Sequence, residues 1–388
     1  MFVVYSKDAC VYCDRAKALL KTRGLQFVDK PGRDVRAKFG SPTYPVIVGP
    51  DNVVIGGYEA LRDQLEEPML QPSLTRFSAF PIEHPDIYDL YKKAVAGFWT
   101  ADELVLTQDS TDFVEKLSDN ERHFLKHVLA FFASSDGIVN ENLLANFSQE
   151  VQLAEARLFY AYQAFNEAEH SRAYGMLIDA LIKDPIERDQ LFHAIVHVPA
   201  VQKKSAWAMK YLHRPTRRFA ERLVAFLCVE GILFSGSFCA IFWMKHTHPG
   251  LMPGLSLSNQ WISRDEALHC DHAVLLYKRL RRSLGQEQVE AIVTEAVDNE
   301  IEFINDAVPC RLIGMNAELM AEYIKFVADR LLQDLGYAKT YNAKNPFPWM
   351  QTICLEGKTN FFESRVSEYQ RAGVLDTEGG KFSLSDDF

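Results

Sequence analysis

The chain has 388 residues, 48% of them hydrophobic, so it is long enough for two or three domains with a large buried core. Its formal net charge of −10 argues against nucleic acid as a partner, because phosphate binding requires a basic surface. The seven cysteines are scattered except for one close pair, which fits a reducing cytosol better than a disulfide framework. The first residues, Met1 to Tyr5, lack a basic segment before an apolar run, so we expect a cytoplasmic protein without a signal peptide.

The first 66 residues alternate between strand and helix signals. The turn sequence Gly-Pro-Asp-Asn at 49–52 separates two β-prone runs, as in a β-hairpin. This order predicts a small α/β domain at 1–66. The expected elements are strands at 2–5, 26–28, 45–48 and 53–55 and helices at 10–20 and 58–65.

A Cys-x-x-Cys motif, Cys10 and Cys13, opens the first expected helix. The helix dipole and free backbone N–H groups at such a position favour a thiolate and lower its pKa. We expect Cys10 to be an exposed nucleophile and Cys13 to be the resolving thiol. Half of a zinc site is the alternative, but the first 66 residues contain no other cysteine and no histidine to complete it.

The rest of the chain reads as helix. A proline-punctuated stretch at 67–74 predicts a linker, and long amphipathic periods follow it with hardly a strand signal. We expect a helical domain at 75–350 and a flexible tail at 351–388, where the periodicity has faded. The expected helices are 86–97, 120–148, 152–182, 187–193, 199–212, 216–246, 258–284, 287–306 and 316–335.

One stretch, Val224 to Met244, is apolar enough to cross a membrane. It carries Glu230 near its centre, and a helix that is hydrophobic all round is also what the middle of a large bundle requires. We interpret it as a buried core helix and expect no membrane association, with a membrane span as the alternative.

Two Glu-x-x-His pairs, Glu167/His170 and Glu266/His269, indicate a metal site. A protein with eleven histidines shows about one such pair by chance, so the surroundings decide. Glu167 and Glu230 lie in strongly apolar runs, and Asp136 follows another; lone carboxylates in such runs are costly unless they are paired or bound to metal. Carboxylate and imidazole ligands together suit iron or manganese better than zinc or calcium. Two such pairs with two lone carboxylates form the pattern of di-iron carboxylate bundles.

Two parts of the chain resemble known families. From about Glu67 to the C-terminus the sequence resembles the radical-generating small (beta) subunit of class I ribonucleotide reductase, closest to the eukaryotic and viral type. The matching stretches are 80–83, 135–142, 229–231, 234–238, 263–271 and 355–363. The first 66 residues resemble glutaredoxin. The implied fold is mainly α: a ferritin-like di-iron helical bundle preceded by a small α/β thioredoxin-fold domain.

The resemblance implies a role for each residue of the site. One iron takes Asp136, Glu167 and His170, and the other takes Glu230, Glu266 and His269, with manganese as a possible replacement for iron. Tyr174, one turn beyond His170, stands where the family carries its tyrosyl radical, in an apolar pocket lined by Phe234, Phe238 and Ile262. The implied radical-transfer relay runs through His170, Asp265 and Trp99 to Tyr369 on the tail.

The glutaredoxin resemblance implies glutathione as the reductant. The residues that match its binding features are Tyr12, the cis-proline turn with Thr43 and Pro45, and the glycine pair Gly56 and Gly57. The Val-Tyr spacer departs from the usual Pro-Tyr, which leaves a thioredoxin-reductase-type donor open.

The implied partners are a second copy of the same protein, in a homodimer, and the large (alpha) subunit, which takes up the C-terminal tail ending in Phe388. The implied activity is that of ribonucleoside-diphosphate reductase. The alternatives are a di-iron oxidase of ferritin-like fold acting on a small or lipid-like substrate, and an iron-storage bundle. Tyr174 and the relay to Tyr369 argue against the oxidase. The storage bundle gives no reason for Trp99, the acidic tail that ends in phenylalanine or the fused redox domain.

Overall fold

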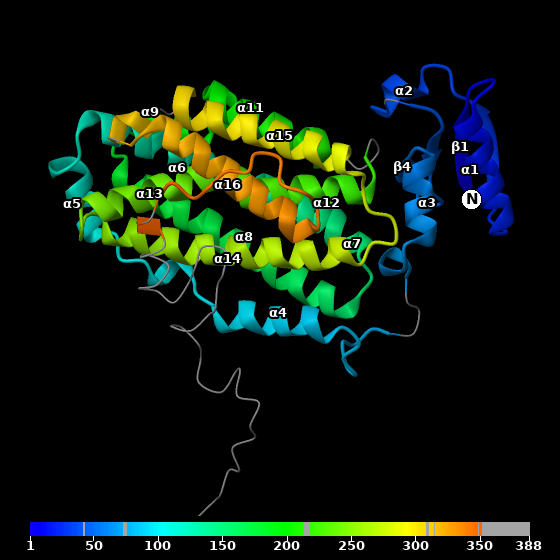
Figure 1. Ribbon diagram of the computed structural model, residues 1–388, viewed down its shortest axis with the longest axis horizontal. Helices are drawn as coiled ribbons and strands as arrows, with labels where there is room; N and C mark the ends of the chain where they lie inside the picture. The colour runs from blue at the N-terminus through cyan, green and yellow to red at the C-terminus, as the bar shows by residue number, and fades with distance from the viewer. Residues whose placement is uncertain are drawn as a thin grey trace, which may run out of the picture.

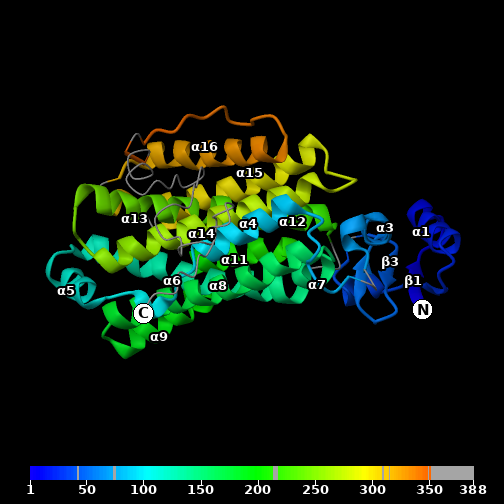
Figure 2. The ribbon, with the colours of Figure 1, turned by 90° about the horizontal axis from the view of Figure 1, so that it is seen from below.

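The computed structural model describes residues 1–41, 43–72, 76–212, 217–307, 310–313, 315–347 and 349–350. A small domain with a sheet lies at one end of a long bundle of helices (Figures 1 and 2). The tail expected at 351–388 lies outside the described residues, and with it Tyr369 and Phe388.

The small domain has one four-stranded sheet in the order β2-β1-β3-β4. Strand β1 pairs in parallel with β2 and antiparallel with β3, which in turn pairs antiparallel with β4. Helices α1 and α3 pack against each other and close the core over Val4, Leu20, Ile47 and Leu61. The strands are β1 (Phe2–Ser6), β2 (Phe27–Pro31), β3 (Val46–Val48) and β4 (Val54–Gly56), and the helices are α1 (Val11–Thr22), α2 (Val35–Lys38) and α3 (Tyr58–Glu66).

The mixed sheet with helices confirms the predicted α/β class of this domain. Every expected strand and helix is present, and only the four-residue helix α2 was not predicted. It is too short to show a hydrophobic period, so its sequence carries no helical signal. The expected cis peptide between Tyr44 and Pro45 is present.

The second part of the chain consists of helices. Helix α4 lies along α8 and α14, and α6 packs against α8 (Figure 1). The longer helices are α4 (Pro85–Ala96), α5 (Thr107–Glu115), α6 (Asp119–Asn142), α8 (Ala154–Leu181), α11 (Pro199–Leu212), α12 (Phe219–Cys228), α13 (Ser235–Thr247), α14 (Pro253–Lys278), α15 (Gln286–Glu302) and α16 (Ala317–Leu335). The shorter ones are α7 (Ser148–Glu150), α9 (Pro185–Phe192), α10 (Ala194–His197) and the 3-10 turns η1 (Pro68–Leu70), η2 (Ala101–Glu103) and η7 (Cys310–Ile313).

In the part of the chain that the structure describes, three π-helical turns interrupt or end long helices. They are η3 (Leu143–Phe147) after α6, η5 (Val229–Leu233) between α12 and α13, and η6 (Phe303–Ala307) after α15. The helix expected at 216–246 is present as Phe219–Thr247, with the π turn η5 between its two α-helical parts, α12 and α13. A hydrophobic pattern does not reveal such a turn, since one extra residue in the turn leaves the apolar character unchanged.

Two further helix predictions differ from the structure. Helix α5 was not predicted, because its sequence is mostly polar; Asp109 and Asp112 are nevertheless buried. The helix expected at 258–284 runs instead from Pro253 to Lys278. Its start is set by α5, since Asp109 accepts hydrogen bonds from the backbone N–H groups of Gly254 and Leu255 at 2.9 and 2.7 Å. Carboxylates at a helix N-terminus satisfy free donors and complement the helix dipole.

The apolar stretch around Glu230 lies in the core. The segment Phe219–Thr247 is long and apolar enough to cross a membrane, but its most hydrophobic window is completely buried among the other helices. It is therefore the core helix that we expected.

The junction between the two parts is held by buried polar contacts. Asp63 on α3 accepts a hydrogen bond from Arg218 Nε at 2.8 Å. Glu67 is buried and accepts from the backbone N–H groups of Arg281 and Arg282 at 2.9 and 3.0 Å. Met69, in η1, belongs to the hydrophobic core of the bundle. The first part of the expected linker is therefore docked on the bundle.

Candidate metal centre

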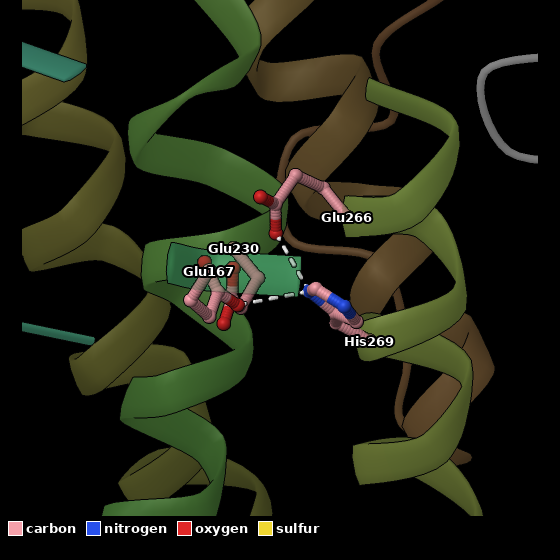
Figure 3. A group of neighbouring side chains, drawn as sticks. All are labelled: Glu167, Glu230, Glu266 and His269. Atoms are coloured by element: carbon pink, nitrogen blue, oxygen red, sulfur yellow. Dashed lines mark hydrogen bonds and ion pairs between the residues drawn. The ribbon is translucent and has the colours of Figure 1, made fainter. Parts of the chain in front are cut away.

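Four buried side chains meet between the helices of the bundle (Figure 3). Glu167 comes from α8, Glu230 from the π turn η5, and Glu266 and His269 from α14. One donor atom of each lies within 4.8 Å of the others, which is close enough for shared metal ions. Because Glu266 and His269 are three residues apart on one helix, they point to the same side.

Glu167 and Glu266 each face both histidines. His269 Nδ1 lies 3.1 Å from Glu167 Oε1 and 3.1 Å from Glu266 Oε2. His170 Nδ1 lies 3.0 Å from Glu266 Oε1 and 3.6 Å from Glu167 Oε2. Carboxylates that span two imidazoles in this way are placed as bridging ligands of a two-metal site would be.

Among the described residues, the carboxylates of the cluster face histidines rather than a permanent cation. In the described part of the chain, no lysine or arginine forms an ion pair with Glu167, Glu230 or Glu266. Glu167 Oε2 and Glu230 Oε2 are buried and make no hydrogen bond to any residue that the structure describes. Buried carboxylates of this kind are unfavourable unless a cation binds them. The donor set therefore fits the divalent cations that carboxylates and imidazoles bind.

The pKa values reflect this crowding. Burial, together with the nearby charges of Glu266 and Glu167, raises the pKa of Glu230 well above its usual range. Burial alone would lower the pKa of His269, but the carboxylates of Glu266 and Glu167 outweigh it and raise this pKa to about 9. In the absence of metal the cluster thus favours bound protons, which a metal would have to displace.

The four-residue cluster does not include two of the predicted ligands, His170 and Asp136. His170 is buried beside the four-residue cluster, one turn after Glu167 on α8. Asp136 lies within α6, but its side chain lies outside the described residues. Sequence reasoning missed Gln163, whose amide is 3.5 Å from Glu167 Oε1 and 3.4 Å from Glu230 Oε1. Its position four residues before Glu167 was the available signal.

Tyr174 is buried in aromatic surroundings. Its ring stacks on Phe132 with centroids 4.6 Å apart, and Phe132 contacts Phe238 at 5.0 Å and Phe234 at 5.7 Å. Phe234, Phe238 and Ile262 are all buried. The direct stacking partner, Phe132, was not predicted. It lies four residues before Asp136 on α6, so it shares a helix face with a predicted ligand.

A series of polar contacts leads away from His170. Asp265 Oδ2 lies 3.4 Å from His170 Nε2 and accepts a hydrogen bond from Trp99 Nε1 at 2.7 Å. Trp99 also stacks on His170, with ring centroids 5.8 Å apart. Burial would raise the pKa of Asp265, but Arg264, His170 and Trp99 together lower it, so this group remains a carboxylate. Sequence reasoning missed Arg264, although it is the neighbour of Asp265.

The thiol pair lies where the first helix begins. Cys10 is the N-cap of α1, its Sγ accepts from the backbone N–H of Cys13 at 3.2 Å, and the two cysteines form a disulfide. The expected exposure of Cys10 is wrong: only 8% of it is accessible, against 1% of Cys13. Burial follows from the cap itself, which turns the sulfur toward the helix backbone.

Of the residues matched to a glutathione site, Gly57 lies beside the proline turn. An added Cβ on Gly57 would lie 3.7 Å from Thr43 Oγ1 and 3.8 Å from the carbonyl of Pro45. Gly56 has a φ of +110°, which favours glycine. Tyr12, on the first turn of α1, is 50% exposed and lies against Tyr58.

Comparison with known proteins identifies a matching family for each part of the chain. The family model "Ribonucleotide reductase, small chain" matches residues 76–346, and the model "Glutaredoxin" matches residues 2–54. The ribonucleoside-diphosphate reductase small subunit of Nicotiana tabacum is 56% identical over 328 residues, which span 83% of this protein and 98% of the tobacco protein. The ribonucleoside-diphosphate reductase subunit M2 of Danio rerio is 54% identical over 324 residues, 83% of each protein.

A solved structure agrees with these matches. The ribonucleotide reductase Rnr4 homodimer from Saccharomyces cerevisiae superimposes with a TM-score of 0.69 at 36% identity, covering 78% of this protein and 95% of the yeast one. Small subunits of this family are di-metal proteins of ferritin-like fold, as the cluster of carboxylates and histidines indicates. The chain belongs to the ribonucleotide reductase small-chain family, as an oxidoreductase subunit that carries an N-terminal glutaredoxin domain.

Proposed function

We propose that this small subunit binds two iron ions and uses them to make a tyrosyl radical on Tyr174. The first ion takes Asp136, Glu167 and His170 as ligands, and the second takes Glu230, Glu266 and His269. Bound iron, or manganese in its place, supplies the oxidising power that dioxygen makes available. The observation that carries this proposal is the buried carboxylate cluster without a neutralising lysine or arginine among the described residues.

Tyr174 gives up one electron and its phenolic proton to become the radical. Such a radical persists only where water and reducing groups are kept away. The stacked ring of Phe132, with Phe234 and Phe238 behind it, provides an apolar enclosure for this purpose. Stacking on Phe132 also fixes the ring of Tyr174 at a constant place beside His170.

We infer that the oxidising equivalent leaves the site through His170, Asp265 and Trp99. The contact between the Asp265 carboxylate and the indole N–H of Trp99 allows a proton to move as the electron does. Tyr369, outside the described residues, continues this relay to the large subunit, where ribonucleotides are reduced to deoxyribonucleotides. Family membership disfavours the alternative of a di-iron oxidase.

The glutaredoxin domain re-reduces the large subunit after each turnover. The Cys10 thiolate attacks one sulfur of the large subunit's disulfide and releases the other as a thiol. Cys13 then displaces the remaining thiol and closes the disulfide with Cys10. Two molecules of glutathione reduce this disulfide and leave as glutathione disulfide, with Tyr12, Thr43, Pro45, Gly56 and Gly57 holding the peptide. A thioredoxin-reductase-type donor is the alternative reductant.

The proposed assembly is a cytoplasmic homodimer that binds the large subunit through the C-terminal tail. The dimer is supported by the homodimeric yeast protein of similar fold. Attachment of the glutaredoxin raises its effective concentration near the large subunit, to the millimolar range for short linkers.

Glu230→Gln should stabilise the metal-free protein and weaken the further stabilisation that bound metal provides. In the metal-free protein this variant should unfold at a temperature higher by about 2–4 °C, because the amide, unlike the buried Glu230 carboxyl with its raised pKa, does not have to take up a proton when the protein folds. The rise in unfolding temperature that excess manganese gives the parent protein should shrink or vanish. Calorimetry with and without metal checks both effects. Glu302→Gln, at an exposed surface pair, is the matched control, and an unchanged metal-induced shift in Glu230→Gln would contradict the ligand assignment.

Tyr174→Phe should bind iron normally and yield neither a radical signal nor nucleotide reduction with the large subunit, because only the phenolic hydroxyl is removed. The measurements are iron stoichiometry and the EPR spectrum after exposure to oxygen. Tyr160→Phe, at another buried tyrosine of α8, is the control and should keep the signal. Undiminished reductase activity in Tyr174→Phe would refute the assignment.

Cys10→Ser should abolish turnover with glutathione and leave turnover with dithiothreitol near normal, because the metal chemistry does not need this thiol. Cys13→Ser should accumulate a mixed disulfide at Cys10, since no resolving thiol remains. Mass spectrometry locates the adduct, and an adduct on a bundle cysteine instead would argue against this role. Cys239→Ser, at a buried cysteine of α13, serves as the control.

Deletion of residues 382–388 should remove binding to the large subunit and leave metal content and radical yield unchanged. Phe382 and Phe388 supply most of the apolar area of this segment, and aromatic anchors dominate small interfaces. A peptide of these seven residues should compete, but only at high concentration, because ordering a free tail has an entropic cost. Surface plasmon resonance measures both; parent-like affinity of the truncated protein would place the contact elsewhere.

A further inference from the structure

A buried ion pair lies beside the broken helix that carries Glu230. Lys204 on α11 and Glu300 on α15 are both fully enclosed, and Lys204 Nζ lies 2.6 Å from Glu300 Oε2. Burial lowers the pKa of Lys204 to about 8, which still leaves the ammonium charged at neutral pH. Neither residue belongs to the ligand set, the aromatic enclosure or the relay.

Both charges are directed at the backbone of the helix break. Lys204 Nζ donates to the carbonyl of Leu233, the last residue of η5, at 2.6 Å. Glu300 Oε1 accepts from the N–H of Gly236, near the start of α13, at 3.0 Å. A π turn shifts the helical hydrogen-bond ladder by one residue, so groups at its end need partners from outside. The ion pair provides one donor and one acceptor for this purpose.

Gly236 is needed for the approach of Glu300. An added Cβ at Gly236 would lie 2.5 Å from Glu300 Oε1 and 2.7 Å from Ile304 Cγ1. Both distances are far below contact distance, so any larger residue would push Glu300 away from the backbone.

The ammonium of Lys204 also contacts the aromatic residues behind Tyr174. It lies 3.5 Å from the ring centroid of Phe131 and 3.9 Å from that of Phe303. Phe131 in turn contacts Phe132 and Phe234, with centroids 5.7 and 5.6 Å away. Cation–π contacts of a desolvated ammonium are among the stronger ones. The pair thus touches both the segment after Glu230 and the aromatic group around Tyr174.

Stability alone does not account for such a pair, because well-packed apolar residues commonly serve a core as well or better. We propose that Lys204 and Glu300 are positioning residues that fix the break between η5 and α13, and so hold Glu230 and Phe234 in place for metal binding and radical protection. This inference rests on the proposed function and adds to it two residues that contact neither metal nor Tyr174.

Cobalt(II) titration of the metal-free full-length protein tests the proposal by absorbance, without any turnover. Lys204→Met should bind cobalt about 10–100-fold more weakly, the range found when outer supports of metal ligands are removed. Gly236→Ala keeps both charges but displaces Glu300, so it should show the same direction of effect. After loading with iron and oxygen, both variants should lose the tyrosyl EPR signal at least about tenfold faster than the parent.

The matched control is Arg76→Met, which removes the cationic partner of another buried carboxylate, Glu155 at the start of α8. Glu155 is twelve residues before Glu167, about 18 Å along the helix, so the metal site should be untouched. All measurements are made well below each variant's unfolding temperature.

Weaker binding in Lys204→Met and Gly236→Ala with parent-like binding in Arg76→Met supports the proposal. Parent-like cobalt affinity in both test variants overturns it, and so does an equal loss in the control, which would indicate general destabilisation. If Lys204→Met does not fold, Gly236→Ala decides alone. Failure of the parent protein itself to bind cobalt would instead overturn the proposed metal site, and the inference with it.

Discussion

Three carboxylates buried side by side, without a neutralising lysine or arginine among the described residues, impose the main constraint on this structure. Other buried acidic groups are compensated within the protein. Some pair with a cation, as Glu155 does with Arg76, and others accept backbone N–H groups, as Asp109 does at α14. Glu167, Glu230 and Glu266 have no lysine, arginine or backbone partner of this kind among the described residues, so the metal-free cluster retains protons, as the raised pKa of Glu230 indicates.

The bundle meets this constraint with two intact helices and one broken one. Helices α8 and α14 each bring a Glu-x-x-His pair to the centre by regular helical spacing. The third carboxylate, Glu230, comes from a π turn, where the backbone hydrogen bonds are no longer regular. This irregular element receives polar contacts from Gln163, Lys204 and Glu300. The π turn that carries Glu230 and the polar side chains that contact it therefore belong to one arrangement.

The fused redox domain is joined to the bundle by more than its linker. Asp63 and Glu67 bind arginine side chains or backbone of the bundle, and Met69 is part of the bundle's core. These contacts restrict how far the domain can swing, because releasing them would expose a buried carboxylate and apolar surface.

The sequence by itself determined the two-part organisation and the redox pair and predicted the candidate metal ligands, because these depend on spacing along one helix or on a local motif. It identified Glu167, His170, Glu266 and His269 through the three-residue period, and Cys10 and Cys13 through their place at a helix start. Tertiary structure decided what depends on contacts between distant segments: the stacking of Phe132 on Tyr174, the start of α14 at the carboxylates of α5, and the meeting of Lys204 with Glu300. It also decided the π turn at Glu230, since this turn does not change the hydrophobic period that a sequence displays.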